Sequence, residues 1–277
     1  MIHEIAPHRY DNAFLQSAPG EGDAALYYEK DTILLCQEGK GWRIPQFSDL
    51  TLEAAEGAER LFSIDGQGFY LLSRLPQALP GRELTLQKVR LLRELAPWVG
   101  FAGVTGWQLG RWEGQHRYCS ACGAPMRASQ RERALVCTKC GCREYPRINP
   151  AVIVAVRDGE DLLMIRSQLS TTGRYHLLSG YVEVGETLEQ TVHREVMEEV
   201  GLKVKNLRYY KSQPWSFSGS LLAGFYCDVD GDPSITLDRE ELSVAEWFDR
   251  DSLPETPNLI SLTGEMIECF RQGKEPK

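Results

Sequence analysis

Several features are missing from this sequence, and each absence removes a class of protein. No apolar run approaches the roughly eighteen residues that cross a membrane, so the chain does not predict a membrane protein. Its first residues, MIHEIAPHRY, contain no basic segment, apolar stretch or cleavage site that would predict export to an oxidising compartment, so we expect a cytoplasmic protein. Acidic residues also outnumber basic ones, with 39 Asp and Glu against 31 Lys and Arg. A net charge of -8 gives no general attraction to nucleic acid.

Cysteine is present in a pattern that predicts metal binding. The segments CSACG and CTKCG carry two Cys-x-x-Cys pairs separated by fourteen residues, one fewer than the usual range of four-cysteine zinc ribbons but with the same plan. The predicted Zn²⁺ ligands are Cys119, Cys122, Cys137 and Cys140. Four thiolates leave no position for water, so the site should be structural. Disulfides are the alternative, and Cys142 lies close enough to compete as a ligand, although the paired spacing favours Cys140.

Positive charge is concentrated in and just after the ribbon, at Arg127, Arg131, Arg133, Lys139, Arg143 and Arg147. Such a cluster could bind a polyanion. It could equally consist of solvated side chains on a small module, and the sequence leaves both interpretations open.

Three glutamates gather on one face of a predicted helix that starts at Thr187 and ends at Gly201. Glu195, Glu198 and Glu199 stand at i, i+3 and i+4, which places them within an arc of about 100°. Their mutual repulsion would disappear if a hard divalent cation bound between them. The pattern therefore predicts a Mg²⁺ or Mn²⁺ site.

This segment resembles the Nudix box, the signature of Mg²⁺-dependent hydrolases that act on a nucleoside diphosphate linked to another group. The matching positions are Gly180, Glu186, Arg194, Glu195, Val196, Glu198, Glu199, Gly201 and Leu202. An acidic solvated helix is the alternative, but so many fixed positions do not coincide by chance. The box implies the chemistry and leaves the substrate to other elements.

A second resemblance concerns the substrate. SQPWSFSGS at residues 212–220 is similar to the SQPWPFPxS array of NADH pyrophosphatases, which have an N-terminal domain, a four-cysteine ribbon and a Nudix domain in this order. The chain departs from the array at Ser216 and Ser218, where the family has proline. The resemblance implies the following substrate-binding residues: Tyr145, Tyr181, Gln213, Pro214, Trp215, Ser216, Phe217, Ser218, Gly219, Ser220 and Thr263. Taken alone, Trp215 and Phe217 would favour core packing over recognition.

The same resemblance implies the metal ligands and the reaction. The catalytic metal would be held by Glu195, Glu199, Glu241 and the main-chain carbonyl of Ser179, although Glu240 beside Glu241 leaves that register open. A glutamate, Glu198 or Glu199, would accept the proton of the attacking water. NADH or NAD would be hydrolysed to NMN(H) and AMP. Members of the family are commonly homodimers, and some remove NAD caps from RNA.

Two alternatives remain open at this stage. The enzyme could prefer ADP-ribose or another nucleotide conjugate. In a different class, the chain could be a non-catalytic nucleotide sensor or nucleic-acid-binding protein that uses the ribbon, although a sensor would not need the complete set of glutamates.

The arrangement of predicted elements favours an α/β fold. Strands are expected at residues 24–36, 68–75, 151–156, 161–167, 221–229 and 244–248, with helices at 84–98, 187–201 and about 257–272. Strands flanked by amphipathic helices predict an α/β/α sandwich, which for a Nudix domain has a mixed sheet. We expect an α+β N-terminal domain over residues 1–115, the ribbon over 116–146 and the Nudix domain over 147–277.

Overall fold

The computed structural model describes residues 1–168, 173–255 and 260–276. The chain divides into two compact units. One contains Ile2–Arg147 with Ser216–Ser218, and the other contains Ile148–Trp215 and Gly219–Lys277 with Met1. The expected three-domain boundaries stay a prediction. No helix in the described part of the chain is both long and apolar enough to cross a membrane.

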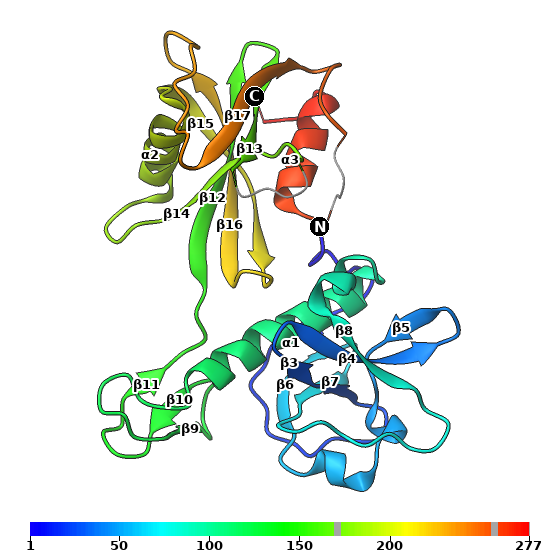
Figure 1. The fold of residues 1–277 in the computed structure, drawn as a ribbon. Coiled ribbons are helices and arrows are strands. Elements are labelled where there is room, and N and C mark those ends of the chain that lie inside the picture. Colours follow the sequence, from blue (N-terminus) through cyan, green and yellow to red (C-terminus); the bar gives the residue numbers. More distant parts are fainter. Residues whose placement is uncertain (169–172, 256–259, 277) are drawn as a thin grey trace. The chain divides into compact units, whose positions relative to one another are not determined.

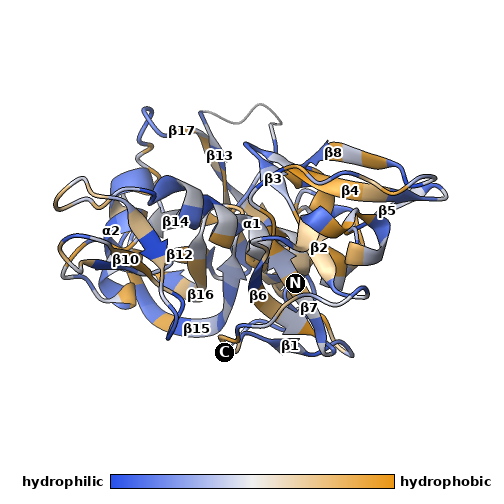
Figure 2. Ribbon diagram, turned by 90° about the horizontal axis from the view of Figure 1, so that it is seen from below, coloured by the Kyte–Doolittle hydropathy of each residue, from blue (hydrophilic) through white to orange (hydrophobic). Residues whose placement is uncertain are grey.

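The first unit opens with two small sheets. One has the strand order β1-β6-β7-β2, and the other has the order β3-β4-β5 with β8 paired to β4. The strands are β1 Tyr10–Asp11, β2 Ala24–Leu26, β3 Tyr28–Glu29, β4 Thr32–Glu38, β5 Gly41–Arg43, β6 Glu59–Ile64, β7 Gln67–Leu71 and β8 Leu84–Lys88, with 3-10 turns η1 Phe47–Asp49 and η2 Leu52–Ala55. Figure 2 colours β4 as hydrophobic, in agreement with the burial of residues 33–36. Residues 24–36, expected to form one strand, form parts of three strands, β2, β3 and β4.

The expected helix over residues 84–98 is wrong. Residues 84–88 form β8, in which Leu84 and Leu86 pair with Cys36 and Leu34 of β4. A 3-10 turn, η3 Val89–Arg93, follows, and the long helix of this unit is α1, Pro97–Gln115. The leucine spacing resembles a helical period because alternating residues of a strand are followed directly by residues of a short 3-10 turn.

Helix α1 was not predicted because it is rich in glycine, which lowers helix propensity. Packing explains the glycines. A Cβ atom at Gly103 would lie 2.7 Å from a methyl carbon of Leu92, and one at Gly106 would lie 2.5 Å from a methyl carbon of Leu26. The helix can approach η3 and β2 this closely only without side chains at these positions.

The ribbon is a three-stranded sheet in the order β11-β10-β9. Its strands are β9 Met126–Ala128, β10 Leu135–Cys137 and β11 Arg143–Glu144. Both cysteine knuckles close at glycines with positive φ, Gly123 at 71° and Gly141 at 74°. This backbone conformation is one that glycine adopts without strain.

The second unit is built on a mixed sheet in the order β15-β16-β12-β13-β17, with β14 also paired to β12. The strands are β12 Asn149–Asp158, β13 Asp161–Ser167, β14 Leu178–Tyr181, β15 Val204–Trp215, β16 Ser220–Val229 and β17 Leu242–Asp249. Strands β12 and β16 run parallel, whereas the other pairings are antiparallel. The predicted strands at 151–156, 161–167, 221–229 and 244–248 are found, while β14 and β15 were missed.

Helices cover both faces of this sheet (Figure 1). Helix α2, Leu188–Val200, packs through Val192, Val196 and Val200 against alternate residues of β12. Helix α3, Leu262–Arg271, packs on the opposite set of β12 side chains. Because successive residues of a strand face opposite sides, one strand serves both cores. The α/β/α sandwich is confirmed. Part of the helix expected at 257–272 lies outside the described residues.

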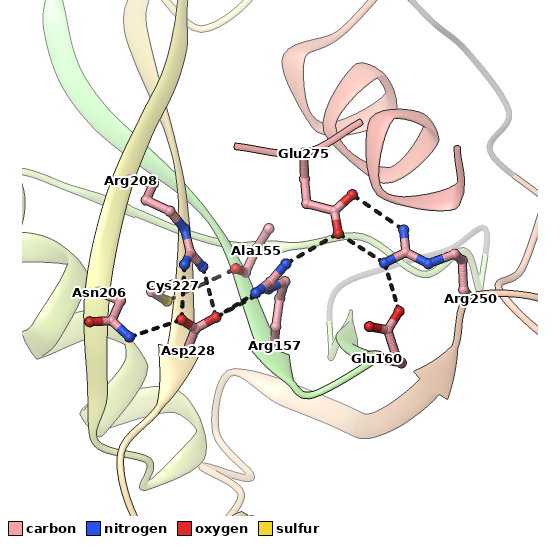
Figure 3. A network of polar contacts seen from close by, with 9 residues as sticks. All are labelled: Ala155, Arg157, Glu160, Asn206, Arg208, Cys227, Asp228, Arg250 and Glu275. Carbon is pink, nitrogen blue, oxygen red and sulfur yellow. Dashed lines mark hydrogen bonds and ion pairs between the residues drawn. The ribbon is translucent and has the colours of Figure 1, made fainter. Parts of the chain in front are cut away.

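At one end of the sheet, charged side chains join β12, β15, β16 and the C-terminal segment (Figure 3). Asp228 accepts hydrogen bonds from Arg208 at 2.7 and 2.9 Å and from Arg157 at 2.9 Å. Glu275 accepts from Arg157 at 3.1 Å and from Arg250 at 2.8 Å. The network ties residues distant in sequence to the same sheet end.

Candidate active site

Helix α2 begins and ends as its sequence predicts. The Thr187 side chain accepts a hydrogen bond from the main-chain N–H of Gln190 at 3.2 Å, and the Gln190 side chain accepts from Thr187 N–H at 2.8 Å. This capping box satisfies helix N–H groups that would otherwise lack partners. Gly201 ends the helix in the left-handed conformation, at φ 70°. The three glutamates are therefore carried on a rigid element.

Arg194 organises the carboxylates around it. Its guanidinium donates to both oxygens of Glu186, at 2.6 and 2.9 Å, and to the main-chain oxygen of Tyr181 at 2.9 Å. It also donates to Glu195 at 2.7 Å and to Glu198 at 3.0 Å. The Arg194 hydrogen bonds hold the pKa of Glu186 at about 2. One cation thus fixes the loop before α2 and two of the predicted site residues.

Gly180 is required by the position of Glu195. A Cβ atom at Gly180 would overlap the carboxyl group of Glu195, so only glycine leaves room for that carboxylate against β14. Burial is the main cause that raises the pKa of Glu195. Gly180 and Glu195, two fixed positions of the motif, are therefore in direct contact with each other.

Glu199 is the most buried carboxylate of the set. The residue is 5% exposed, and no lysine, arginine or histidine of the described residues forms an ion pair with it. Burial, with the nearby charges of Glu195 and Glu241, raises the pKa of Glu199 to about 8. A buried carboxylate among other carboxylates, without a counter-charge, is the arrangement that a bound divalent cation would stabilise.

A cavity of about 330 Å³ lies against this carboxylate. It is lined by Ile165, Ser167, His176, Ser179, Glu199, Glu240, Glu241 and Leu242. Both Glu240 and Glu241 border it, but Glu241 is the one that raises the pKa values of Glu195 and Glu199. This favours the predicted register, in which Glu241 faces the other carboxylates.

The donor set fits a hard divalent metal, since it consists of carboxylates and a main-chain carbonyl at Ser179. Among the described residues, the glutamate oxygens do not yet converge to within 4.8 Å, as the four ribbon thiols do. Glu195, Glu199 and Glu241 are the residues that would hold the metal. Glu198 is more exposed and hydrogen-bonded to Arg194.

His176 was not predicted as a site residue, yet it lines the same cavity. A sequence signal exists. In the segment HLLSG, His176 and Leu178 stand two apart, and strand alternation places such residues on the same face. Leu178 belongs to the core that packs on α2, so this alternation points His176 toward the glutamate helix.

The SQPWSFSGS array forms a hairpin. Its first four residues end β15, a turn follows at residues 216–219, and Ser220 begins β16. Gly219 adopts a positive φ of 73°, and its N–H donates to the main-chain oxygen of Trp215 at 3.1 Å. The turn therefore forms without the two prolines of the family pattern.

The structure places the array residues differently from one another. Gln213 is fully buried, and its side chain bonds the main chain at Ile260 (2.8 Å) and Leu262 (2.6 Å), at the start of α3. The Tyr181 ring is half-exposed, with its hydroxyl 3.4 Å from the Ser220 hydroxyl. The structure thus brings Tyr181 and Ser220, both predicted substrate-binding residues, together. Substrate contact by Gln213 stays a prediction, and what the structure shows for it is an anchoring role.

The remaining predicted substrate residues are distributed over both units. The Arg93 guanidinium lies 4.4 Å from the centre of the Phe217 ring. Tyr145 is 51% exposed, and its hydroxyl donates to Glu132 at 3.3 Å. Thr263 lies in the first turn of α3, after the N-cap Ser261. Because Tyr145 and Tyr181 belong to different units, a joint stacking role stays a prediction.

The four ribbon thiols converge as predicted. Cys119 and Cys140 sulfurs lie 3.6 Å apart, Cys122 and Cys137 sulfurs 3.5 Å apart, and all four lie within 4.8 Å of one another. Thiolates about 2.3 Å from a tetrahedral zinc stand at similar separations. Main-chain N–H groups of Cys140 and Lys139 lower the pKa of Cys137 to about 6, which favours the thiolate. Cys142 lies outside this set.

Several of the basic ribbon residues are engaged within the protein. Arg143 pairs with Glu132, and Arg147 lies 3.4 Å from Glu144. Arg133 donates to the main-chain oxygens of Leu61 and Asn12. The paired glutamates offset the charges of Arg143 and Arg147, which weakens their contribution to an electrostatic surface for a polyanion.

Comparisons with known proteins agree with this geometry. The NUDIX domain family matches residues 147–268, and the NADH pyrophosphatase zinc ribbon domain matches residues 115–145. The NAD-capped RNA hydrolase NudC of Klebsiella pneumoniae is 46% identical over 164 residues, which cover 59% of this chain and 63% of that protein. The NudC of Stutzerimonas stutzeri is 44% identical over 163 residues, 59% of each chain. The match thus spans about three fifths of these relatives.

Solved structures agree at the level of the fold. A NUDIX hydrolase from Nitrosomonas europaea superposes with a TM-score of 0.50 at 20% identity, covering 58% of this chain and 94% of that one. The matched segments stand in sequence order, and the sheet of the second unit has the α/β/α layers expected of a Nudix domain. The chain therefore carries a Nudix domain at residues 147–268, preceded by a zinc ribbon of the NADH pyrophosphatase type at residues 115–145.

Proposed function

We propose that this protein hydrolyses the pyrophosphate bond of NADH or NAD to NMN(H) and AMP with the help of a divalent metal. The observation that carries the proposal is the cavity where buried Glu199 meets Glu241 and Ser179 without a counter-charge. The similarity to NAD-capped RNA hydrolases and the array on the β15–β16 hairpin support the choice of substrate.

The residues have distinct roles in this proposal. A bound divalent metal would neutralise the pyrophosphate oxygens and make water a stronger nucleophile. Glu199 and Glu241 border the cavity, and Arg194 keeps Glu195 and Glu198 oriented through its hydrogen bonds. Glu198 or Glu199 accepts the proton of the attacking water, because both are carried on the same rigid helix.

Tyr181 and Ser220 would contact the dinucleotide. Their hydroxyls already approach each other, and the half-exposed Tyr181 ring offers a face on which a nicotinamide can stack. ADP-ribose lacks that ring and would gain nothing from the contact.

Replacing Tyr181 with Ala should therefore reduce kcat/KM for NADH about tenfold, since stacking contributes roughly 0.5–1.5 kcal/mol and 1.4 kcal/mol corresponds to a factor of ten. The change for ADP-ribose should be much smaller. Initial rates on both substrates check this, with Tyr181→Phe as the control that keeps the ring. Equal losses on both substrates would show that Tyr181 only packs the site.

The preferred substrate is tested by initial rates on NADH, NAD, ADP-ribose and an NAD-capped RNA at equal concentrations. We expect the initial rate on NADH, NAD or NAD-capped RNA to exceed the initial rate on ADP-ribose. A clear preference for ADP-ribose would replace the proposed function with hydrolysis of other nucleotide conjugates.

The catalytic metal is proposed to be Mg²⁺ or Mn²⁺, with Zn²⁺ held by the ribbon thiols. A homodimer in the cytoplasm, as the family resemblance implies, belongs to the same proposal. Four thiolate ligands need a reducing environment, which supports that location. Light scattering of the zinc-loaded protein tests the dimer.

A further inference from the structure

His176 stands in the glutamate cavity although no motif of the chain accounts for it. The other polar groups that border this space are oxygen donors, from Ser167, Ser179, Glu199, Glu240 and Glu241. An imidazole is chemically different from these, because its ring nitrogens bind metals that differ from those preferred by carboxylates.

The main chain fixes the position of His176. Its N–H donates to Ile165 O at 2.9 Å, and its carbonyl accepts from Ile165 N–H at 2.9 Å. Directly opposed residues of an antiparallel bridge project their side chains to the same face. Ile165 belongs to the core that packs on α2, so His176 projects toward the helix that carries Glu199.

A hydrogen bond also fixes the ring proton. The Nδ1 atom of His176 lies 3.0 Å from the main-chain oxygen of Leu177. A carbonyl oxygen can only accept, so Nδ1 is the donor and carries the hydrogen. In the neutral ring this leaves Nε2 with its lone pair. Histidines that bind metals characteristically donate their other ring N–H to a main-chain carbonyl or carboxylate in this way.

We propose that His176 supplies an Nε2 ligand to the metal held by the glutamates, and that this nitrogen makes the site favour Mn²⁺ over Mg²⁺. The inference rests on the proposed function only in placing a divalent metal at Glu199 and Glu241. Mg²⁺ is bound mainly through carboxylates, phosphates and water, whereas Mn²⁺ is the first member of the transition-metal series whose affinity for nitrogen-containing sites rises along the row. A mixed nitrogen and carboxylate site would therefore discriminate between the two ions.

The test uses the full-length, zinc-loaded protein and Mn²⁺ as the probe. Electron paramagnetic resonance of free Mn²⁺ gives the Mn²⁺ affinity, and competition gives the affinity for Mg²⁺. Pulsed measurements detect a ¹⁴N nucleus bound directly to Mn²⁺. The variants are His176→Gln and His176→Asn, with His193→Gln as the matched control, because His193 is an exposed histidine of α2 outside the cavity lining.

We expect a ¹⁴N coupling in the wild type and in the His193→Gln control, and its loss in both His176 variants. The Mn²⁺ affinity of those variants should fall about tenfold or more, on the scale of a lost metal-site interaction. Their Mg²⁺ affinity should change much less. Absence of the ¹⁴N coupling in the wild type, or an unchanged ratio of the two affinities in both variants, would overturn the assignment.

This outcome is separable from the proposed function. NADH hydrolysis by a protein without the ¹⁴N coupling would overturn the role of His176 and leave the enzyme intact. A ¹⁴N coupling that disappears in His176→Gln, in a protein that does not hydrolyse NADH, would support the nitrogen ligand and remove the proposed reaction.

Discussion

At the scale of single residues, the contact between Gly180 and Glu195 shows why a glycine belongs to a catalytic motif. The glycine makes no chemical contribution of its own. Its missing side chain is the space that the Glu195 carboxyl group occupies. Arg194 then holds that carboxylate at 2.7 Å. Since the atoms that would collide belong to the far end of a flexible side chain, substitution here should displace the carboxylate more than it disturbs the fold.

We expect Gly180→Ala to lower metal-dependent turnover at least tenfold, on the scale of a catalytic group moved out of place, while the melting temperature changes little. Gly114→Ala is the control, because a Cβ at Gly114 meets no atom within 4 Å. Activity and thermal unfolding measured together check this. A large loss of stability with normal turnover per folded molecule would show that Gly180 serves packing alone.

Residue roles could be predicted from the sequence where a motif fixes both spacing and chemistry. The glutamates of α2 and the four ribbon cysteines are of this kind. Arg194 pairs with Glu195 and Glu198, Glu199 borders the cavity, and the four thiols converge. Gln213 shows the limit, because its burial at the start of α3 depends on residues about fifty positions away. His176 shows a second limit of prediction, because its position at the cavity depends on a single β-bridge to Ile165.

At the scale of elements, tertiary packing decided the cases in which local pattern failed. The glycines of α1 oppose helix formation locally, but they allow close approach to Leu92 and Leu26. Residues 84–88 became a strand because β4 offered a partner. Helix α2, by contrast, has its own cap signals and apolar stripe, so its bounds could be predicted within one residue.

The charged network at the sheet end gives this unit a defined acid sensitivity. Hydrogen bonds from Arg208, with help from Asn206 and Arg157, lower the pKa of Asp228 to about 2. The folded-state pKa lies below the unfolded value, so the stabilisation is present above about pH 4 and is lost as the pH falls toward 2.

Asp228→Asn should therefore destabilise the protein at neutral pH by about 2 kcal/mol, as expected for lost hydrogen bonds to charged groups. The difference from wild type should shrink as the pH falls from 4 toward 2. Denaturant unfolding across this range checks both parts, with the exposed Asp230→Asn as control. A constant difference at every pH would mean that the pKa of Asp228 is the same in the folded and unfolded states, which contradicts the prediction.

At the scale of the whole molecule, the ribbon is a small module with few buried apolar residues, and its four thiols supply the cross-link. Three short strands and two glycine knuckles cannot form a core of useful size. Metal binding then contributes directly to folding. The fold of the Nudix domain and the presence of the ribbon were predictable, while the sheet order of residues 2–96 was not, because no motif specifies those pairings.

Removal of zinc by a chelator under reducing conditions should lower the melting temperature by about 5 °C or more, since structural zinc contributes folding free energy. Metal analysis of the native protein should find about one zinc per chain. Cys119→Ser should lose this zinc, and Cys142→Ser should keep it because Cys142 lies outside the four-thiol set. Unchanged zinc content and melting in Cys119→Ser would refute the site.

The most direct test of the central claim is hydrolysis of NADH in ¹⁸O-labelled water, with the products identified by mass. With Mg²⁺ or Mn²⁺ present, the account predicts NMNH and AMP in equal amounts and one ¹⁸O atom incorporated per bond cleaved. Glu198→Gln and Glu199→Gln should each reduce this rate about 100-fold or more, the scale of a lost acid–base or metal contribution. Absence of these products from the wild type, or near-normal turnover in both variants, would contradict the account.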